Sequence, residues 1–191
     1  MTEQKRLIIG ISGASGAQYG IRLLEACQAL NLESHLIISK AAEITITQET
    51  KYSVADVKAL ATENHNPLNI GASIASGSFQ TIGMVILPCS IRSMSEVATG
   101  VTSSLLTRAA DVTLKERRKL IIAIRETPFH TGHLRAMTQL SEMGAIIAPP
   151  IPAFYTQPQT VEDIVDQFTG HALNLLGVEN SLSKQWNGLG K

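Results

Sequence analysis

Residues 7–16, Leu-Ile-Ile-Gly-Ile-Ser-Gly-Ala-Ser-Gly, constrain the fold more than any other part of the chain. Four of the first five positions are apolar, which is typical of a strand buried on both faces. A glycine-rich turn follows directly, and residues 17–30 then have helical spacing. A strand that passes through small residues into a helix N-terminus directs free backbone N–H groups and the helix dipole at one point. We therefore predict a phosphate-bearing ligand near residues 13–16.

The glycines of this turn follow neither of the common phosphate-binding fingerprints. They give the pattern G-x-x-G-x-x-G, with glycine at positions 10, 13 and 16, instead of G-x-G-x-x-G. No Gly-Lys-Ser or Gly-Lys-Thr sequence follows, so the segment is not a P-loop. Ser12 and Ser15 offer hydroxyl groups in their place. The alternative is a tight turn whose small residues serve packing alone.

Short apolar runs alternate with helical segments along the rest of the chain. Strands are predicted at residues 7–11, 35–39, 84–87, 120–124 and 145–148, with Pro88 ending the third. Helices are predicted at residues 17–30, 41–49, 53–62, 93–99, 102–109, 114–118, 133–143 and 160–176. Ser39 is expected to cap the second helix, and Ser-Val-Ala-Asp at 53–56 is a capping box for the third.

This alternation predicts a three-layer α/β/α fold with a Rossmann-like, doubly wound parallel sheet. We expect a single domain over residues 1–191, with a loosely held tail at about 178–191. In such sheets ligands bind beyond the carboxyl ends of the strands. Residues 13–15, 39–40, 89–93, 125–126 and 150–155 follow the predicted strands, so we expect them to converge on one edge of the sheet.

The composition excludes several classes of partner. Sixteen basic and sixteen acidic residues cancel, and aromatic residues are only 4%, so the chain lacks the charge and the stacking surfaces of a nucleic-acid-binding protein. No apolar run approaches about 18 residues, so no membrane span is expected. With no signal peptide before the first strand, we predict a cytoplasmic protein. Charged residues make up only 17%, which favours association of copies.

The cysteines and histidines show no spacing typical of a metal site. Cys27 and Cys89 fit no disulfide framework. Cys89 is interpreted as a small packed residue rather than as a nucleophile. The histidines stand at positions 35, 65, 130, 133 and 171, without a clean spacing to acidic residues. We expect no metal site.

Five motifs occur together in a fixed order. They are Gly-Ala-Ser-Gly-Ala at 13–17, Leu-Pro-Cys-Ser at 87–90, Thr-Arg-Ala-Ala-Asp-Val-Thr-Leu-Lys-Glu-Arg-Arg at 107–118, Arg-Glu-Thr-Pro at 125–128 and Pro-Ala-Phe-Tyr at 152–155. Over about residues 7–176 the chain resembles the flavin prenyltransferases of the UbiX type. The resemblance implies a dodecamer that joins a dimethylallyl group from dimethylallyl phosphate to N5 and C6 of reduced FMN, without a metal. It implies that prenylated FMN passes to a UbiD-type decarboxylase in ubiquinone biosynthesis or aromatic-acid decarboxylation.

The resemblance also implies the FMN contacts. They are Gly13, Ala14, Ser15, Ser39, Ser90, Ile91, Arg92, Ser93 and Arg125. Serine-rich turns offer N–H and hydroxyl donors, and Arg125 is a permanent planar cation suited to a phosphate or an electron-rich flavin edge. The alternative for Arg125 is an ion pair with Glu126 or Glu142 at a helix end.

The resemblance implies that the substrate phosphate is bound by Arg108, Lys115, Tyr155 and His171. The resemblance assigns acid/base and polar roles in catalysis to Ser15, Glu49, Lys115 and Glu126. Positive charge and proton donors stabilise the negative charge that develops on a departing phosphate. Three of these residues also have a plain alternative: Lys115 as a solvated lysine of a basic run, Glu49 as a glutamate at a helix end, and His171 as an inert helix residue.

His171 departs from the family pattern, which has an arginine at this position. A histidine is shorter and its charge depends on pH, so phosphate binding is expected to differ, and the donor is either the phosphate or the pyrophosphate. Two other functions stay open from the residues alone. One is a flavin-dependent cysteine decarboxylase, which needs a histidine base near the flavin; the other is a non-catalytic FMN carrier.

Overall fold

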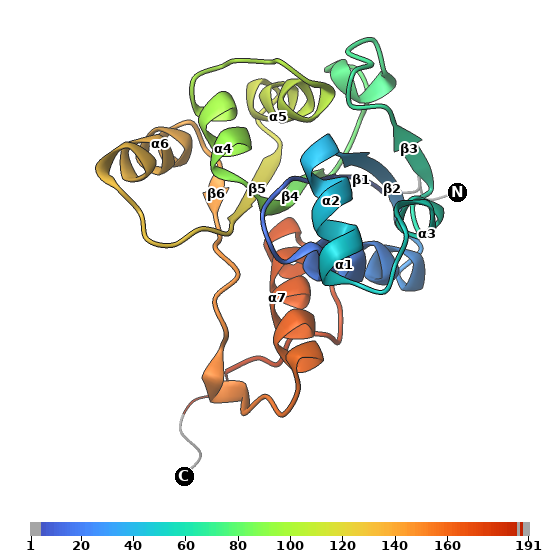
Figure 1. Cartoon of the computed structure of the whole chain (residues 1–191), viewed down its shortest axis with the longest axis vertical. Helices are drawn as coiled ribbons and strands as arrows, with labels where there is room; N and C mark the ends of the chain where they lie inside the picture. Colours follow the sequence, from blue (N-terminus) through green and yellow to red (C-terminus); the bar gives the residue numbers. More distant parts are fainter. Residues whose placement is uncertain (1–4, 187, 189–191) are drawn as a thin grey trace.

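The computed structural model describes residues 5–186 and 188, and it is built on a parallel sheet ordered β3-β2-β1-β4-β5-β6 (Figure 1). The strands are β1 (Arg6–Ile11), β2 (Glu33–Ile38), β3 (Glu63–His65), β4 (Gly83–Cys89), β5 (Lys119–Ile124) and β6 (Ile146–Ile147). Every two neighbouring strands run parallel to each other. This strand order is that of a doubly wound sheet, and it reverses between β1 and β4. The predicted fold class is confirmed.

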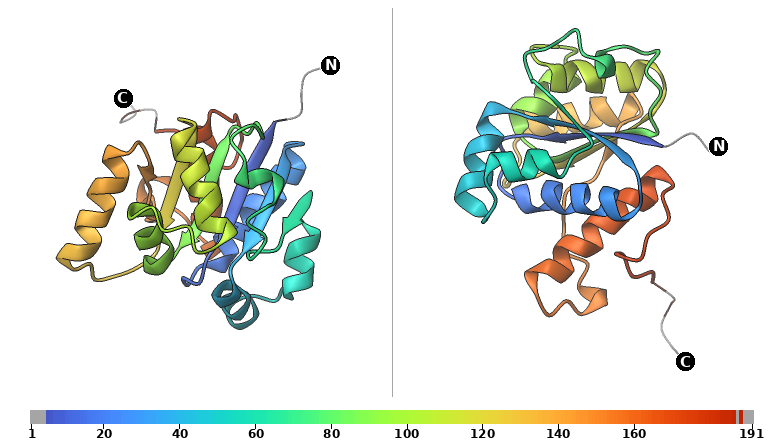
Figure 2. Two further views of the ribbon diagram at one scale, coloured as in Figure 1. Left: turned by 90° about the horizontal axis from the view of Figure 1, so that it is seen from above. Right: turned by 90° about the vertical axis from the view of Figure 1, so that its right-hand side faces the viewer.

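Helices cover both faces of the sheet (Figure 2). The helices are α1 (Ala17–Ala29), α2 (Lys40–Glu49), α3 (Val54–Ala59), α4 (Ile91–Ala98), α5 (Leu105–Lys115), α6 (Thr131–Glu142) and α7 (Val161–Leu176), with short 3-10 turns η1 (Ser73–Ala75) and η2 (Phe154–Thr156). One buried apolar cluster joins the sheet to α1, α2, α3 and α7, and a second joins it to α4, α5, α6 and η1. The chain therefore forms the expected three layers.

The central strands are buried along almost their whole length. In β1 every residue from Leu7 to Ile11 is buried, and all seven residues of β4 are buried. Because alternate side chains point to opposite faces, Ile9 packs in the first cluster and Ile8 in the second. Burial of each such side chain contributes about 1.5–3 kcal/mol, so continuous apolar runs are what this double-sided sheet requires.

The structure differs from the sequence expectation at three elements. The strand β4 does not end at Pro88 but continues to Cys89, with an irregular register against β5. One helix, α5, replaces the two predicted at 102–109 and 114–118, because no glycine or proline interrupts it and its buried face is continuous. The short strand β3 was not predicted, since Glu63-Asn64-His65 contains no apolar residue.

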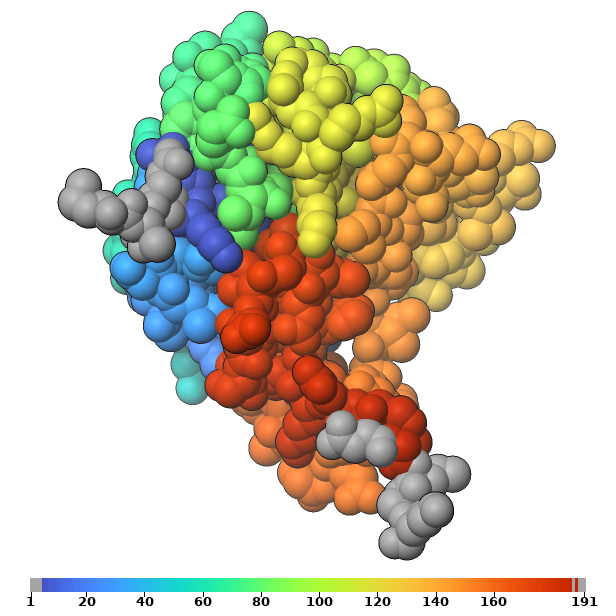
Figure 3. All heavy atoms as spheres, turned by 180° about the vertical axis from the view of Figure 1, so that it is seen from behind, coloured from blue at the N-terminus to red at the C-terminus, as the bar shows by residue number. Residues whose placement is uncertain are grey.

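The segment after α7 runs back along that helix. Lys184 N donates to Gln167 Oε1 at 2.8 Å, and Asn180 Nδ2 donates to the Gly170 carbonyl oxygen at 3.0 Å. These bonds join Asn180 and Lys184 to α7, and the loose attachment expected for the tail stays a prediction. Residues 187 and 189–191 of that tail lie outside the described residues. With η2, this segment projects beyond the body of the molecule (Figure 3). No helix of the described chain has the length and apolarity needed to cross a membrane.

Candidate active site

The loops at the carboxyl edge of the sheet are tied together by backbone groups and one buried hydroxyl. Ser12, only 1% exposed, donates its hydroxyl to the Pro88 carbonyl oxygen at 3.0 Å and accepts from Ser90 N at 2.7 Å. Arg125 N donates to the Cys89 carbonyl oxygen at 3.1 Å. The Ser12 hydroxyl, which the sequence suggested for a ligand, therefore joins the loops after β1 and β4 instead.

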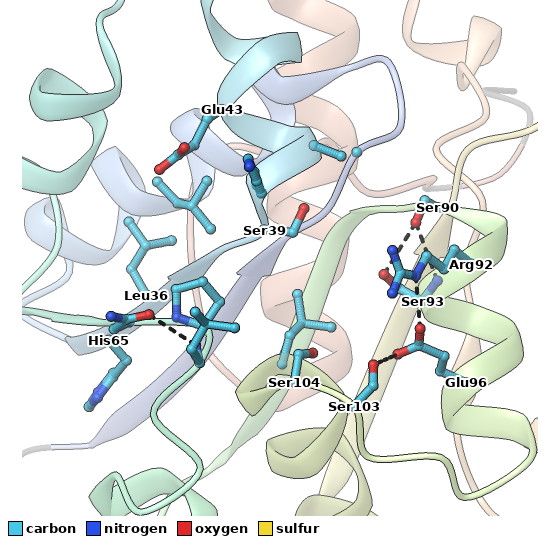
Figure 4. A pocket seen from close by; sticks show the side chains of 18 of the residues that line it. Leu36, Ser39, Glu43, His65, Ser90, Arg92, Ser93, Glu96, Ser103 and Ser104 are labelled. Atoms are coloured by element: carbon cyan, nitrogen blue, oxygen red, sulfur yellow. Dashed lines mark hydrogen bonds and ion pairs between the residues drawn. The ribbon is translucent and has the colours of Figure 1, made fainter.

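A pocket of about 720 Å³ opens between these loops (Figure 4). It is lined by Gly13, Leu36, Ile38, Ser39, Lys40, Ala41, Glu43, Lys58, Asn64, His65, Asn66, Pro67, Leu68, Ser90, Arg92, Ser93, Glu96, Ser103, Ser104 and Leu106. It lies beside the point where the strand order reverses, which is where doubly wound sheets bind ligands. Its volume suits a cofactor or a small molecule. Of the predicted FMN contacts, Gly13, Ser39, Ser90, Arg92 and Ser93 are brought together here.

Two helix N-termini reach this pocket. Ser39 caps α2 by accepting from Ala42 N at 3.2 Å, and Ser90 caps α4 by accepting from Ser93 N at 3.3 Å. The Ser39 cap is the predicted one, whereas the Ser90 cap was not predicted, because the helix was expected to begin at residue 93. Both helices direct the positive end of their dipoles toward the pocket edge. Lys40 stands in the first turn of α2 and has no carboxylate partner among the described residues. The pocket wall is therefore suited to an anion.

The opposite wall carries a charged network from α4 and the loop that follows it. Arg92 Nε donates to Glu96 Oε1 at 2.9 Å, and Ser103 Oγ donates to Glu96 Oε2 at 2.6 Å (Figure 4). The Arg92 side chain is 83% exposed. Its exposed guanidinium keeps free N–H groups for a ligand.

Gly13 allows the loop after β1 to approach α2. A Cβ atom at this position would lie 2.4 Å from the Ala41 Cβ, closer than any side chain permits. Glycine at position 13 is therefore required for the contact between this loop and α2, and the pocket wall depends on that contact.

Glu49 occupies the N-terminus of α1. Its Oε2 accepts from Gly16 N at 2.7 Å and from Ala17 N at 3.3 Å. Gly16 itself has φ of 103° and gives no side-chain cap. The free N–H groups predicted to bind a phosphate at this helix are thus satisfied by a carboxylate, and the anion-suited wall lies at α2 and α4.

Several predicted residues lie near the same edge without lining the pocket. Arg125 and Glu126 are exposed directly after β5, and Glu126 Oε1 accepts from Thr127 N at 3.0 Å. Burial raises the pKa of Tyr19, and the nearby Arg125 charge partly offsets this rise. The predicted contacts Ala14, Ser15 and Ile91 flank pocket residues in the loop after β1 and at the start of α4.

The predicted phosphate ligands are not brought together within one chain. Lys115 ends α5 at the amino edge of the sheet, where it contacts Gly77 and pairs with Glu116. Arg108, earlier in α5, pairs with Asp111 at 3.0 Å. Tyr155 lies on the projecting η2, where its ring packs against Trp186, and His171 is exposed on α7.

Cys89 is fully buried between the two loops. Burial raises the pKa of its thiol to about 12, so it stays protonated at neutral pH. Because the thiolate is the nucleophile, the interpretation of Cys89 as a packed residue agrees with its surroundings.

Sequence reasoning missed the third wall of the pocket. Residues 66–68 follow β3, and Ser103 and Ser104 precede α5. Ser104 forms a capping box with Thr107, a local signal that the sequence carries. For residues 66–68 no such signal exists, because their position depends on the pairing of β3 with β2.

The fold and the pocket define a flavoprotein-type nucleotide-binding protein, and the Flavoprotein family model matches residues 1–173. Flavin prenyltransferase UbiX of Escherichia coli (strain K12) is 52% identical over 187 residues, which cover 96% of this chain and 99% of that protein. A crystal structure of AnUbiX in complex with FMN and dimethylallyl pyrophosphate superposes with a TM-score of 0.97 at 41% identity, covering 98% of this chain and all of that one.

A dodecameric FMN-dependent UbiX-like decarboxylase from Escherichia coli O157:H7 superposes with a TM-score of 0.93 at 46% identity, covering 96% of this chain and 100% of that one. The chain belongs to the flavin prenyltransferase family. The FMN-dependent cysteine decarboxylase SpaF reaches a TM-score of 0.62 at 17% identity, over 75% of this chain and 83% of that one, so it shares the fold alone.

Proposed function

We propose that this chain joins a dimethylallyl group from dimethylallyl phosphate to N5 and C6 of reduced FMN, without a metal, and so makes prenylated FMN. The observation that carries the proposal is the pocket at the strand-order reversal, lined by two serine-capped helix N-termini in a chain of this family. The complex of AnUbiX with FMN and dimethylallyl pyrophosphate supports the same pair of ligands here, with the pyrophosphate as the other candidate donor.

FMN is held in this proposal by the residues that line or flank the pocket. Ser39, Lys40 and the N-terminus of α2 suit its phosphate, since N–H groups and a cation converge there. Ser90, Arg92 and Ser93 offer hydroxyl and guanidinium donors from the opposite wall. Gly13, Ala14, Ser15, Ile91 and Arg125 complete the predicted set. Reduced FMN, when bound, supplies the electron-rich atoms N5 and C6.

The donor phosphate is bound in this proposal by residues of more than one copy of the chain. Lys115 and the pocket lie at opposite edges of the sheet, so one copy alone does not gather the predicted ligands. The dodecameric relative supports assembly of copies, with twelve the proposed number here. Exposed apolar residues such as Leu68 at the pocket and Phe154 beside Tyr155, 81% and 73% exposed, suit such contacts.

Glu126 is the proposed acid/base residue. Glu126 would give a proton to the departing phosphate and so offset the charge that grows as the carbon–oxygen bond breaks. Its carboxylate would then take up the proton that C6 loses as the second ring bond forms. The proton that N5 loses on alkylation balances the one that the dimethylallyl double bond gains in that second step. Arg108, Lys115, Tyr155 and His171 are the proposed partners of the phosphate. Ser15 and Glu49 form the proposed polar pair near N5. The product would pass to a UbiD-type decarboxylase, and a cytoplasmic location stays a prediction.

Mass spectrometry of the flavin tests the reaction. The purified protein is incubated anaerobically with reduced FMN and dimethylallyl phosphate, and separately with the pyrophosphate. Only the proposed reaction adds a five-carbon unit to the flavin. A flavin that binds but keeps its mass with both donors would identify an FMN carrier and overturn the proposal.

Mixed oligomers test the sharing of the site. Lys115→Met and Glu126→Gln are each expected to retain FMN and lose turnover. Co-expression of the two variants is expected to restore part of the activity, because some sites then combine an intact Lys115 from one copy with an intact Glu126 from another. Folded, oligomeric mixtures without recovery would contradict a site built from several copies.

A further inference from the structure

Three side chains that commonly bind metals meet on two neighbouring strands at the edge of the sheet. His35 lies on β2, and Glu63 and His65 lie on β3. Parallel pairing sets His35 beside Glu63, and Ile37 beside His65. His35 and His65 are 30 residues apart in the chain, which hides the cluster from a search for spacing motifs. In the described part of the chain, no other three histidine, cysteine or acidic side chains converge in this way.

We propose that the His35–Glu63–His65 cluster binds one Zn²⁺ ion per chain. The ligand atoms are His35 Nδ1, His65 Nε2 and a carboxylate oxygen of Glu63, with water in the fourth position. Two imidazoles and one carboxylate form a ligand set that zinc accepts. Of the three residues, only His65 also lines the flavin pocket, and the chemistry of the two sites differs.

The distances between the ligand atoms suit a tetrahedral ion. His35 Nδ1 lies 3.0 Å from His65 Nε2 and 3.3 Å from Glu63 Oε2, and His65 Nε2 lies 3.7 Å from Glu63 Oε1. Zinc–ligand bonds of about 2.0–2.1 Å in a tetrahedron place ligand atoms about 3.3 Å apart. The two distances to Glu63 involve different oxygens of its carboxylate, and the three ligand atoms all lie within 4.8 Å of one another. A small rotation of the exposed Glu63 side chain would bring one oxygen toward both rings.

The other nitrogen of His35 is held by a carboxylate. His35 Nε2 lies 3.0 Å from Glu33 Oε1, and since a carboxylate only accepts, Nε2 carries the proton. Arg6 Nε in turn donates to both oxygens of Glu33 at 3.1 Å. This arrangement leaves a lone pair on His35 Nδ1, directed at the Glu63 carboxylate and His65. Metal-binding histidines are commonly oriented in this way by a carboxylate behind them.

Without an ion, one ring-to-ring hydrogen bond satisfies part of the cluster. With the proton of His35 on Nε2, a neutral His65 can donate its Nε2–H to His35 Nδ1 at 3.0 Å. The Glu63 carboxylate, which only accepts, faces the same Nδ1 lone pair at 3.3 Å and gains no partner from it. The experiment must therefore distinguish a zinc ion from this hydrogen bond.

The surroundings combine an apolar shell with one open side. The His35 and His65 side chains are 1% and 5% exposed, whereas Glu63 is 53% exposed. The Phe79 ring packs edge-on against His35 at 4.9 Å. An ion would thus enter past Glu63 and bind two rings that are already fixed, which lowers the entropic cost of binding.

A bound ion would fix the edge strand β3. This strand is only three residues long, and residues 66–68, which follow it, line the pocket. A bridge between β2 and β3 would anchor that wall of the pocket. In Figure 4, His65 lies at the end of the pocket away from Ser90 and Arg92, so the ion would act on the wall and not on the reaction.

Titration with zinc alone tests the site in the full-length protein. The protein is prepared without a polyhistidine tag, freed of metal with a chelator, and titrated against a competing chromophoric indicator. One zinc per chain is expected, with a rise in the melting temperature. Glu63→Gln is expected to weaken binding at least tenfold, as is Glu33→Gln through the orientation of His35. Glu142→Gln, an exposed glutamate on α6, is the matched control and should bind zinc as the wild type does.

X-ray absorption by the zinc-loaded wild type does not depend on any variant folding. Two imidazole ligands plus oxygen are expected around the ion. A shell without two imidazoles, an absence of stoichiometric zinc, or full affinity in a folded Glu63→Gln variant would each overturn the proposal. In the case of no zinc, the hydrogen bond between His65 and His35 is what holds the cluster.

Discussion

The carboxylate of Glu49 accepts a hydrogen bond from Gly16 N at 2.7 Å, so the end of α2 caps the start of α1. The two residues are 33 positions apart, and Ala17 N adds a longer bond to the same oxygen. An anion at a helix N-terminus satisfies free N–H groups and is stabilised by the helix dipole. Because the loop between β1 and α1 carries Gly13 and Ser15, this bond also fixes one side of the candidate site.

Replacement of Glu49 by alanine is expected to lower the free energy of unfolding by about 1 kcal/mol, the usual cost of losing a cap. The measurement is urea denaturation followed by circular dichroism. Glu142→Ala removes an exposed glutamate near the C-terminal end of α6, where it caps nothing in the described structure, and is the control. Equal stability of the Glu49→Ala variant and the wild type would show that water caps α1 equally well.

Replacement of Ser12 by alanine should loosen the link between the loops after β1 and β4. The hydroxyl joins the Pro88 carbonyl oxygen to Ser90 N, and its loss leaves both groups without this buried partner. The expected cost is about 1–3 kcal/mol. FMN affinity, measured by fluorescence quenching, should fall because the Ser90 cap is displaced. Ser141→Ala, at an exposed position on α6, should change neither quantity.

Gly13→Ala should damage the pocket more than the addition of one methyl group suggests. The new Cβ would lie 2.4 Å from the Ala41 Cβ, so α2 must move away from the loop. Such overpacking costs about 1–3 kcal/mol, and the displaced α2 N-terminus should weaken FMN binding. The matched control is Gly71→Ala, where the nearest atom is 3.6 Å away. FMN titration that gives the same affinity for both variants would contradict the role given to Gly13.

The parts of the site that the sequence predicts are those set by local chemistry. Ser39 follows an apolar run directly and precedes a helical segment, and it caps that helix as expected. Ser90 was predicted as a site residue by resemblance, and its role as a helix cap came from the structure. The role of Ser12 was not predictable in this way, because its partner Pro88 is 76 residues away. The strand β3 was missed for a related reason: its position is set by pairing with β2, while its own residues are polar.

The resemblance to a family predicts site residues that do not all lie together within one copy of the chain. The motif at 107–118 predicts Lys115 as a site residue, yet Lys115 ends α5 at the amino edge of the sheet, opposite the pocket. No periodicity or spacing indicates that a residue acts in another copy of the chain. The low fraction of charged residues is the one compositional sign of such assembly, and it does not say which surfaces meet.

His171→Arg should tighten binding of the dimethylallyl donor, and most clearly above neutral pH. A guanidinium keeps its charge throughout this range, whereas the charge of a histidine depends on pH. The KM for dimethylallyl phosphate should fall in the variant at high pH and differ less at low pH. His171→Gln, which carries no charge at any pH, should match the wild type at high pH. A KM that is the same for all three proteins across the pH range would remove His171 from the phosphate site.

The two buried thiols should make stability depend on pH in the alkaline range. Burial raises the pKa of Cys27 and of Cys89 from 9.0 to about 12. The native state therefore keeps protons that the unfolded state loses, so the contribution of the thiols is complete below about pH 9 and declines as the pH rises toward 12. Urea denaturation at pH 8 and pH 10 should show this decline, and a Cys27→Ala/Cys89→Ala variant should show a smaller one. An equal decline in both proteins would mean that other groups carry the dependence.

The same burial predicts slow chemical labelling of the two cysteines. At pH 8 a thiol reagent should label the native chain only slowly, because the buried thiols are neither ionised nor accessible. In urea it should label both cysteines rapidly.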